Sequence, residues 1–229
     1  MFSGIPLIDG DPIVYRAAFA CKDDEPVEHV WYTAKRMLEQ IIDQFDRGLE
    51  YKVFLTGPGN YREAIAKEQK YKGNRTQPKP KYYQDVRDYM EKWWRAEIIT
   101  GKEADDALGC AQTKETCIVS IDKDLDMIPG FHYNPVKQHY YEVSELDGWR
   151  FFYTQLLTGD RVDNIKGINK VGPKTAAKIL AGINSKEAME QAVLQRYYEE
   201  YGKAKGLQLA TERGALLWIQ RNPGEVWTP

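Results

Sequence analysis

The sequence predicts an α/β fold with a mainly parallel sheet flanked by helices, followed by a helical C-terminal subdomain. Up to about residue 147, short apolar runs typical of buried strands alternate with segments of helical periodicity. From Trp149 onwards, helical segments dominate. With 229 residues, 42% of them hydrophobic, the chain is long enough for two domains. We therefore expect one domain at residues 1–147 and a second at residues 148–229.

The bounds of the expected elements follow from periodicity and from the positions of glycine and proline. Strands are expected at 5–8, 51–55, 97–99 and 116–121, with two short strands within 131–143. Helices are expected at 12–20, 27–47, 82–95, 104–112, 149–157, 173–181, 185–201 and 207–221, with Gly48 as a C-terminal cap of the second. The basic, proline-dotted stretch 61–80 lacks periodicity, so we expect a loop or mobile arch there, within an arch region of about 57–96.

Composition excludes several classes of protein. No run reaches the ~18 apolar residues of a membrane helix, so no membrane partner is expected. The segment 1–9 lacks the basic start and long apolar stretch of a secretory signal. Cys21, Cys110 and Cys117 lack the paired spacing of a zinc site, and the three histidines are scattered. These features predict reduced thiols and a cytoplasmic location, in a bacterium or in a phage-infected host.

The charges are unevenly spread, although the net charge is only −2. Residues 62–81 hold seven basic and two acidic side chains, and residues 164–178 hold four lysines and no acid. Two such basic patches can bind phosphates even when the total charge is near zero. If the eight acids Asp9, Glu103, Asp105, Asp106, Asp122, Asp124, Asp160 and Asp163 are set aside, the remaining charge is +6. This distribution fits metal ions among the acids and nucleic acid around them.

Carboxylates gather in four short clusters. They are Asp9 with Asp11, Glu103 with Asp105 and Asp106, Asp122 with Asp124, and Asp160 with Asp163. The first and third clusters follow expected strands, and the carboxyl ends of parallel strands meet at one edge of a sheet. In an extended strand end Asp122 and Asp124 point the same way, and Asp160 and Asp163 share a face if their turn is helical. We expect these carboxylates to converge.

Converging carboxylates repel one another and need compensating cations. Oxygen ligands without histidine or cysteine select Mg²⁺ or Mn²⁺ over Zn²⁺. More than one cluster suggests two metal positions, which can activate a water and stabilise the leaving oxygen at a phosphodiester. The alternative is that acids at strand ends and helix starts are ordinary caps. Asp126, which continues the alternation, is expected to be such a turn or cap residue.

Several motifs occur in the order seen in 5′ nucleases. They are Leu7-Ile-Asp9-Gly10, Tyr71-Lys-Gly-Asn-Arg75, Glu103-Ala-Asp105-Asp106, Ile118-Val-Ser-Ile-Asp122-Lys-Asp124, Gly159-Asp160-Arg-Val-Asp163-Asn164 and Gly167-Ile-Asn-Lys-Val-Gly172-Pro-Lys174-Thr175-Ala176. From about residue 5 to 182 the sequence resembles flap endonucleases, the 5′-nuclease domains of bacterial DNA polymerases and, most of all, stand-alone bacteriophage 5′-to-3′ exonucleases. The resemblance implies a PIN-like α/β domain with a helical arch and a helix–hairpin–helix DNA-binding subdomain.

The resemblance also implies roles for individual residues. One metal position would be organised by Asp9, Glu103, Asp105, Asp106, Asp122 and Asp124, and a second by Asp160 and Asp163. Lys72 and Arg75 would lie near the scissile phosphate. The family usually places an Asp at the end of the second strand, where this chain has Thr56. Asp11 is a candidate substitute ligand, although it could equally be a helix N-cap.

Two basic elements are candidates for DNA contact. Arg62, Tyr71, Lys72 and Arg75 belong to the first, where cations can offset charge in a transition state and a tyrosine can stack on an exposed base. Lys170, Gly172, Lys174, Thr175 and Lys178 belong to the hairpin, which would contact the DNA backbone. By resemblance, carbonyls of Ile168 and Val171 would bind a potassium ion. For each element the alternative is a solvated loop or a packing turn.

Taken together, these features predict a metal-dependent 5′ nuclease that hydrolyses DNA phosphodiesters at or near 5′ ends, flaps or overhangs. Asp122, Asp124, Lys72 and Arg75 are the expected catalytic residues. Three alternatives stay open: a non-catalytic DNA-structure-binding relative, suggested by Thr56; a PIN-type ribonuclease; and an α/β hydrolase of small phosphate esters. The sequence leaves protein partners unknown.

Overall fold

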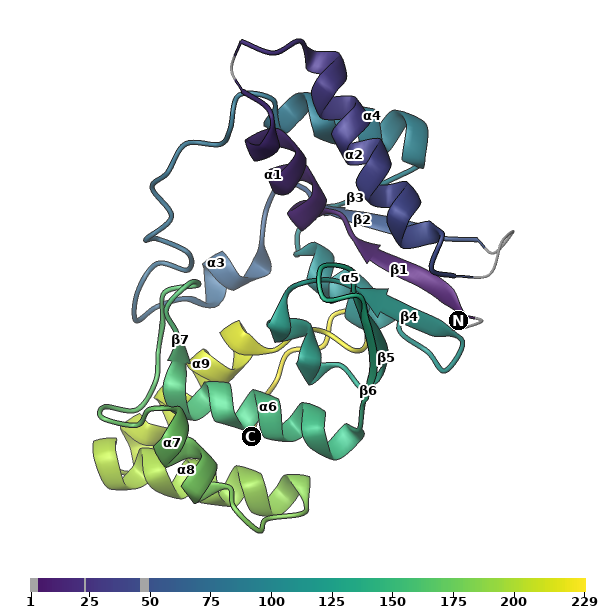
Figure 1. The fold of residues 1–229 in the computed structure, drawn as a ribbon. Coiled ribbons are helices and arrows are strands. Elements are labelled where there is room, and N and C mark those ends of the chain that lie inside the picture. The colour runs from purple at the N-terminus through teal and green to yellow at the C-terminus, as the bar shows by residue number, and fades with distance from the viewer. Residues whose placement is uncertain (1–3, 23, 46–49) are drawn as a thin grey trace. The chain divides into compact units, whose positions relative to one another are not determined.

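A computed structural model describes residues 4–22, 24–45 and 50–229 (Figure 1). The chain forms two compact units. The first comprises Met1–Gly59, Gln77–Leu125 and Gly130–Glu142, and the second comprises Asn60–Thr76, Asp126–Pro129 and Val143–Pro229. The expected boundary at residue 147 is close to the last of these divisions. The expected cap at Gly48 lies outside the described residues.

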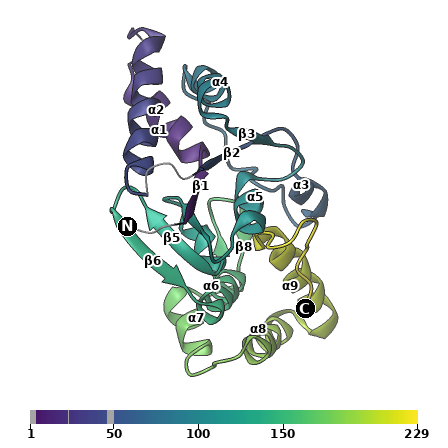
Figure 2. The ribbon, with the colours of Figure 1, turned by 90° about the vertical axis from the view of Figure 1, so that its right-hand side faces the viewer.

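The first unit contains a six-stranded sheet in the order β3-β2-β1-β4-β5-β6 (Figure 2). Its strands are β1 (Ile5–Asp9), β2 (Lys52–Thr56), β3 (Glu97–Ile99), β4 (Thr116–Val119), β5 (Gly130–Asn134) and β6 (His139–Val143). β1 pairs in parallel with both β2 and β4, and the pairs β2–β3 and β4–β5 are also parallel. The mainly parallel sheet expected from the sequence is confirmed.

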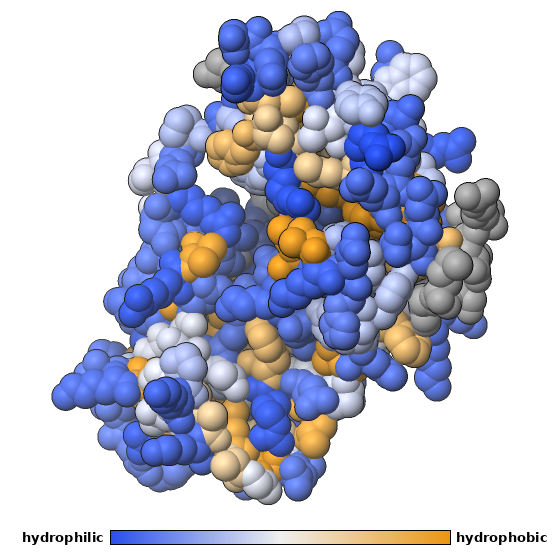
Figure 3. All heavy atoms as spheres, in the orientation of Figure 1, coloured by the Kyte–Doolittle hydropathy of each residue, from blue (hydrophilic) through white to orange (hydrophobic). Residues whose placement is uncertain are grey.

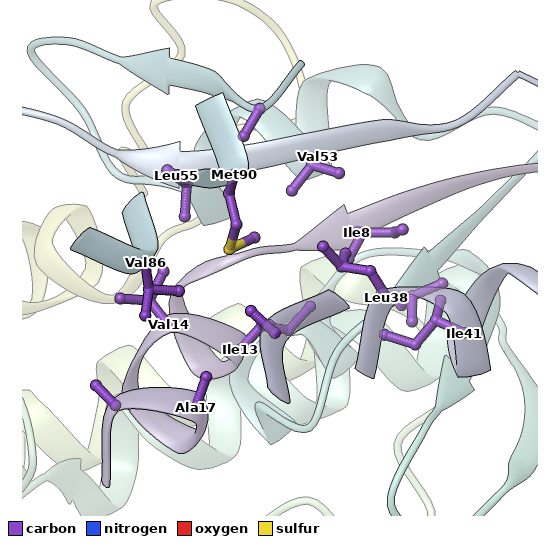
Figure 4. Packing of buried hydrophobic residues seen from close by; sticks show 14 of the residues in the cluster. Ile8, Ile13, Val14, Ala17, Leu38, Ile41, Val53, Leu55, Val86 and Met90 are labelled. Atoms are coloured by element: carbon purple, nitrogen blue, oxygen red, sulfur yellow. The ribbon is translucent and has the colours of Figure 1, made fainter. Parts of the chain in front are cut away.

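Three helices cover one face of this sheet: α1 (Asp11–Ala20), α2 (Val27–Ile42) and α4 (Tyr83–Trp94). Their apolar sides meet alternate strand residues such as Ile8, Val53 and Val119 in a buried cluster (Figure 4). The intervening residues, such as Leu7 and Phe54, are also buried and point to the opposite face because side chains alternate along a strand. A further helix, α5 (Ala104–Ala111), packs against β1 and β2. Burial on both faces explains why these strands read as continuous apolar runs.

Gly10 allows the chain to turn from β1 into α1 directly beside β2. Its N–H donates to the Phe54 carbonyl at 2.9 Å. A Cβ atom at this position would lie 2.7 Å from the Leu55 side chain and 2.8 Å from the Phe54 carbonyl oxygen. Only glycine permits this approach, which sets Asp9 and Asp11 against the end of β2.

The second unit is mainly helical, as expected. It contains α3 (Tyr61–Ile65), α6 (Glu145–Thr158), α7 (Pro173–Ile179), α8 (Lys186–Tyr201) and α9 (Lys203–Leu217). A short antiparallel pair, β7 (Gly159–Asp160) with β8 (Ile165–Lys166), precedes the hairpin at 167–172. Asp160 therefore lies in a strand and not in the helical turn that would have set it on one face with Asp163. Gly159 has φ +73°, and a Cβ there would lie 2.2 Å from the Gly167 nitrogen, so the close pairing needs glycine.

The segment 60–76 packs within the helical unit, although the sequence suggested a loop or mobile arch for 61–80. Arg62 is 1% exposed, and its guanidinium donates to the Leu216 and Trp218 carbonyls. Glu68 accepts two hydrogen bonds from buried Arg213, both at 2.9 Å. Buried charges need partners of this kind. These partners lie far away along the chain, so the sequence of 61–80 shows no periodic pattern that would predict the packing. Tyr61–Ile65 is helical because Asn60 caps it, its side chain accepting from the Arg62 N–H.

The face shown in Figure 3 is covered mostly by hydrophilic side chains, with scattered apolar patches. Scattered exposed apolar residues are usual on protein surfaces. Among the described residues, no helix combines the length and apolar character needed to cross a membrane.

Replacement of Leu38 by Ala tests the packing of the first unit. Leu38 is fully buried among α1, α2 and β1, so its truncation should lower the free energy of unfolding by about 2–5 kcal/mol. Urea denaturation would measure the loss. Tyr32→Ala is the control on the same helix because Tyr32 is 63% exposed, and its effect should stay within about 0.5 kcal/mol. Similar losses in both variants would contradict this packing.

Candidate functional site

The carboxyl ends of β1, β2 and β4 bring side chains from four parts of the chain together. Asp9 is the last residue of β1, and Asp11 is the first residue of α1. Thr56 ends β2, and Ser120 directly follows β4. β1 lies between the other two strands, at the point where the strand order changes direction. Open α/β sheets place their sites at such a point.

Asp9 is a buried carboxylate beside Ser120 and Asp122. It is 5% exposed, and its Oδ2 accepts a 2.6 Å hydrogen bond from Ser120 Oγ. Ser120 Oγ in turn accepts from the Asp122 N–H at 2.9 Å. The pKa of Asp9 is raised to about 8, mainly by burial and also by the negative charges of Asp11 and Asp122, while the hydrogen bond from Ser120 opposes the rise. The expected convergence of the first and third acidic clusters is present in the structure.

Asp122 and Asp124 do not continue the strand, as the sequence suggested. β4 ends at Val119, and Lys123–Met127 is a 3-10 helix. Asp122 caps it, its Oδ1 accepting from the Asp124 N–H at 2.9 Å. The expectation of two carboxylates on one side of an extended strand was therefore wrong. An aspartate can satisfy the free N–H groups of a helical turn, and this local bond competes with strand continuation.

Asp11 has a well-defined set of partners at the end of β2. Its oxygens accept from the Thr56 N–H at 3.2 and 3.3 Å, and Oδ1 lies 3.3 Å from Nη1 of Arg87. Arg87 also donates to the Thr56 carbonyl at 2.8 Å, while Thr56 Oγ1 accepts from the Ala104 N–H at 2.9 Å. Burial raises the pKa of Asp11, against the opposing effects of Thr56 and Arg87. The carboxylate of Asp11 thus lies at the end of β2, and its expected role as a substitute ligand stays a prediction.

The acids of α5 form a reciprocal cap. The Glu103 side chain accepts from the Asp106 N–H, and Asp106 Oδ2 accepts from the Glu103 N–H at 3.2 Å. Both side chains are buried, and Asp105 is half-buried. This is the capping role that the sequence left open as an alternative. Repulsion from Glu103 contributes to the raised pKa of Asp11, which shows that the two acids are close.

The donor set fits a hard divalent cation. The charges of Asp11 and Asp122 raise the pKa of Asp9, the charge of Glu103 raises the pKa of Asp11, and a bound cation would offset this repulsion. A cavity of about 240 Å³ lies beside Asp9 and Ser120, but Asp11, Glu103 and Asp122 do not line it. In the described part of the chain, no three His, Cys, Asp or Glu side chains are arranged to hold a metal ion as they stand. The ligand assignment stays a prediction.

In the second unit, the two acids of the fourth cluster have separate partners. Oδ1 of Asp160 accepts from the Val162 N–H at 2.7 Å, and this hydrogen bond stabilises the turn between β7 and β8. Asp163 accepts from the Tyr71 hydroxyl at 2.9 Å and from Arg75 Nη2 at 2.6 Å, and it lies 3.5 Å from Lys72 Nζ. The second metal position also stays a prediction.

The hairpin presents a polar surface. Its side chains Lys170, Lys174, Thr175 and Lys178 are exposed, and Gly172 is half-buried. Ile168 and Val171 are buried, and the Ile168 carbonyl accepts from the Val171 N–H at 3.1 Å. The lysines are free to meet phosphates, in line with their expected role.

Two residues expected to touch DNA are buried instead. Arg62 is enclosed by carbonyls of the 216–218 segment, and the ring of Tyr71 is 6% exposed. Direct contact of either side chain with DNA is therefore contradicted. Their polar atoms are used within the unit, a role that the basic character of the segment did not reveal.

Sequence reasoning missed Ser120 and Arg87. Ser120 lies two residues before Asp122, at a strand end already known to carry acids, so its position could have suggested a role. Arg87 lies within a helix 76 residues from its partner Asp11. Without a structure nothing distinguishes it from a surface arginine.

Proteins of known activity resemble this chain in sequence. No protein-family model matches it. It is 26% identical to a 5′-3′ exonuclease of Buchnera aphidicola over 240 residues, covering 94% of this chain and 80% of that protein. It is 26% identical to a thermostable DNA polymerase I of Thermus aquaticus over 204 residues, covering 80% of this chain. The chain spans about a quarter of the length of that polymerase, 24%.

Solved structures share the fold. A bacteriophage T5 protein co-crystallised with metal ions gives a TM-score of 0.71 at 15% identity, covering 93% of this chain and 88% of the other. The catalytic core of Rad2 in complex with a DNA substrate gives 0.57 at 13% identity, covering 99% and 80%. The similarity to 5′ nucleases inferred from the sequence motifs is confirmed, and the chain has the fold of these proteins.

The raised pKa of Asp9 predicts how pH affects the metal-free protein. An unfolded Asp ionises near pH 4, whereas folded Asp9 ionises near 8. Between these values the folded state holds one more proton, so this residue's contribution to stability falls as the pH rises from about 4 to about 8. The free energy of unfolding of Asp9→Asn, relative to that of the parent protein, should increase as the pH rises from about 4 to about 8. Above that range the difference should stay constant. Urea unfolding in EDTA would measure this, and parallel pH profiles would contradict it.

Proposed function

We propose that this protein is a metal-dependent 5′ nuclease that hydrolyses DNA phosphodiesters at or near 5′ ends, as a 5′-to-3′ exonuclease, a flap endonuclease or both. The observation that carries the proposal is the buried carboxyl group of Asp9, with the negative charges of Asp11 and Asp122 beside it. Relatives and structural neighbours named as exonucleases or as complexes with DNA and metal ions support it. The proposed metal is Mg²⁺ or Mn²⁺, because all proposed ligands are oxygen atoms.

The first metal position is proposed to lie beside Asp9. Its proposed ligands are Asp9, Asp11, Glu103, Asp105, Asp106, Asp122 and Asp124. Asp160 and Asp163 are the proposed ligands of a second position. The metals would supply activation of water and stabilisation of the leaving oxygen. Ser120 holds the buried Asp9 carboxylate and the Asp122 backbone in place.

Basic groups of the second unit would bind the DNA. Lys170, Lys174, Thr175 and Lys178 would contact the phosphate backbone of a duplex, with no selection for sequence. Lys72 and Arg75 would offset negative charge near the scissile phosphate. Carbonyls of Ile168 and Val171 are the proposed ligands of a potassium ion. Within the described ranges no cysteine forms a disulfide, which is compatible with the proposed location in the reducing cytoplasm of a bacterium or a phage-infected cell.

Thr56 favours one alternative, a DNA-structure-binding relative that does not cleave. Against it, both oxygens of Asp11 lie at the Thr56 N–H, so a carboxylate is present at the end of β2. A ribonuclease of the PIN type is the other alternative. The lysines of the hairpin fit duplex DNA, and cleavage of matched RNA and DNA substrates at equal salt would distinguish the two.

Cleavage of a 5′-labelled flap duplex in Mg²⁺, Mn²⁺ or EDTA tests the function. The parent protein should release short 5′ products that disappear with EDTA, and their lengths separate exonuclease from flap endonuclease. Asp122→Asn with Asp124→Asn should reduce the rate by at least about 1000-fold, because removing charges that stabilise a transition state costs several kcal/mol, while duplex binding persists.

The control variant is Asp88→Asn with Glu91→Gln, which makes the same charge change at exposed positions of α4. It should cleave at the parent rate. Undiminished turnover by the first variant would rule out this site. A parent protein that shifts the flap duplex on a gel but leaves it intact would support the non-catalytic alternative.

The hairpin lysines give a separate prediction about binding. Lys174→Ala with Lys178→Ala should weaken duplex binding in EDTA and lower the slope of log K against log salt by about two, because two phosphate contacts are lost. Lys203→Ala with Lys205→Ala removes equal charge from exposed positions of α9 and is the control. Fluorescence anisotropy over a salt series measures both. Equal effects would mean that the hairpin has no special role.

A further inference from the structure

Arg213 of α9 lies at the centre of a group of polar contacts in the second unit. Its side chain is 3% exposed. Nε and Nη2 donate to the two carboxylate oxygens of Glu68, both at 2.9 Å, and Nη1 donates to the Gly167 carbonyl at 3.1 Å. Glu68 belongs to the segment 60–76 that carries Lys72 and Arg75, whereas Gly167 begins the hairpin. One guanidinium therefore joins the two basic elements of this unit.

The contact between Arg213 and Glu68 specifies direction as well as distance. Two parallel hydrogen bonds from a planar guanidinium to a carboxylate strongly restrict the arrangement of the two groups. Burial would raise the pKa of Glu68, but the hydrogen bonds and charges of Arg213 and Lys166 lower it overall, so the carboxylate is ionised at neutral pH. The ring centroids of Tyr197 and Tyr201 lie 5.6 and 5.3 Å from Cζ of the guanidinium. A rotation of Arg213 would break several of these contacts at once.

The preceding residue of α9 holds the same segment by its backbone. Oε1 of Glu212 accepts from the N–H groups of Lys67 and Glu68, both at 2.6 Å. Lys72 follows only four residues after Glu68, and its N–H donates to the Asp163 carbonyl at 3.0 Å. Because this stretch is short and held at both ends, a displacement of Glu68 would also displace Lys72.

A buried ion pair is a costly way to join two segments. The removal of charges from water opposes folding, and apolar residues of similar volume often give equal or greater stability. Apolar contacts, however, tolerate small changes in the relative position of the groups. Polar groups in a coiled-coil core select one register at a cost in stability. The pair of Arg213 and Glu68 has the properties of such a positioning contact.

We propose that Arg213 sets the separation between the hairpin and the cations Lys72 and Arg75, and that this separation determines which phosphodiester is cut. This inference rests on the proposed function and deepens it, because it names what determines product length. Successive phosphates of one strand lie about 3.4 Å apart along the duplex axis. The hairpin holds the duplex, Lys72 and Arg75 offset charge at one phosphate, and a fixed separation selects one bond. Arg213 is a positioning residue, with Glu68 as its partner.

Cleavage of a 5′-labelled flap duplex in Mg²⁺ by Arg213→Lys and by Glu68→Asp is the test. Both variants keep the charges, but lysine cannot form the bidentate contact and aspartate is shorter by one methylene. We expect kcat to fall about 10- to 100-fold, because small misplacements caused far from the chemistry have effects of this size. We also expect cleavage at more than one bond, where the parent protein prefers one.

Duplex binding separates positioning from a general loss of structure. The hairpin keeps its own attachment to α6, where the Ile168 N–H donates to the Leu157 carbonyl at 2.8 Å. Affinity in EDTA, measured by fluorescence anisotropy, should therefore stay within about twofold of the parent value, because the phosphate contacts are unchanged. Product lengths report only on folded molecules, so a partly unfolded variant still gives an answer. Thermal melting measures the folded fraction.

The matched controls are Arg196→Lys and Glu199→Asp, which make the same changes in the exposed ion pair between Arg196 and Glu199 on α8. They should keep the parent kcat and product lengths. Unchanged product lengths from both test variants would overturn the proposal even if kcat falls, because lower stability reduces the amount of active protein without moving the cut. A loss of duplex binding in EDTA that parallels the loss of kcat would also overturn it.

The parent protein distinguishes this inference from the proposed function. If the parent protein does not cleave the flap duplex in Mg²⁺ or Mn²⁺, the proposed function fails and this inference fails with it. If the parent protein cleaves and both test variants cut at the same bond as the parent, this inference alone fails.

Discussion

The burial of Asp9 at the end of the central strand is the constraint to which the rest of the site responds. A carboxylate removed from water favours its neutral form, and here further acids surround it. The protein offsets this with a short hydrogen bond from Ser120 and with a glycine turn that leads straight into α1. Such an arrangement weakens the metal-free fold, and a bound cation would offset this loss. Asp9 ends β1, where the strand order changes direction. The ends of the neighbouring strands β2 and β4 lie on either side of it.

Thr56 ends β2 without a carboxylate of its own, yet it organises three neighbouring groups. Its hydroxyl caps α5, and its N–H and carbonyl hold Asp11 and Arg87. The carboxylate beside the end of β2 comes from the first turn of α1. Arg87 is a permanent cation within the same cluster, so fewer negative charges remain uncompensated there than the count of acids suggests. These contacts join the end of β2 to α1, α4 and α5.

Sequence alone predicted the parts of the fold that follow from local periodicity and from motifs. The parallel strands, the helical second unit and the convergence of Asp9 with Asp122 were all anticipated. The sequence did not predict contacts of polar side chains with residues far along the chain. Arg62, for example, is buried and donates to the carbonyls of residues 216 and 218. The prediction also failed at Asp122, where a local cap ends the strand early. Both failures arise because hydrogen bonds of single side chains leave no repeating pattern in the sequence.

The division of the chain has a consequence for its integrity. The backbone passes between the two units five times, after residues 59, 76, 125, 129 and 142. A single proteolytic nick at any one of these passages would leave the fragments tied by the other four and by the packing within each unit. Neither unit could be expressed as one continuous piece, so truncation would damage both. The molecule should therefore resist limited digestion as a whole and fail as a whole.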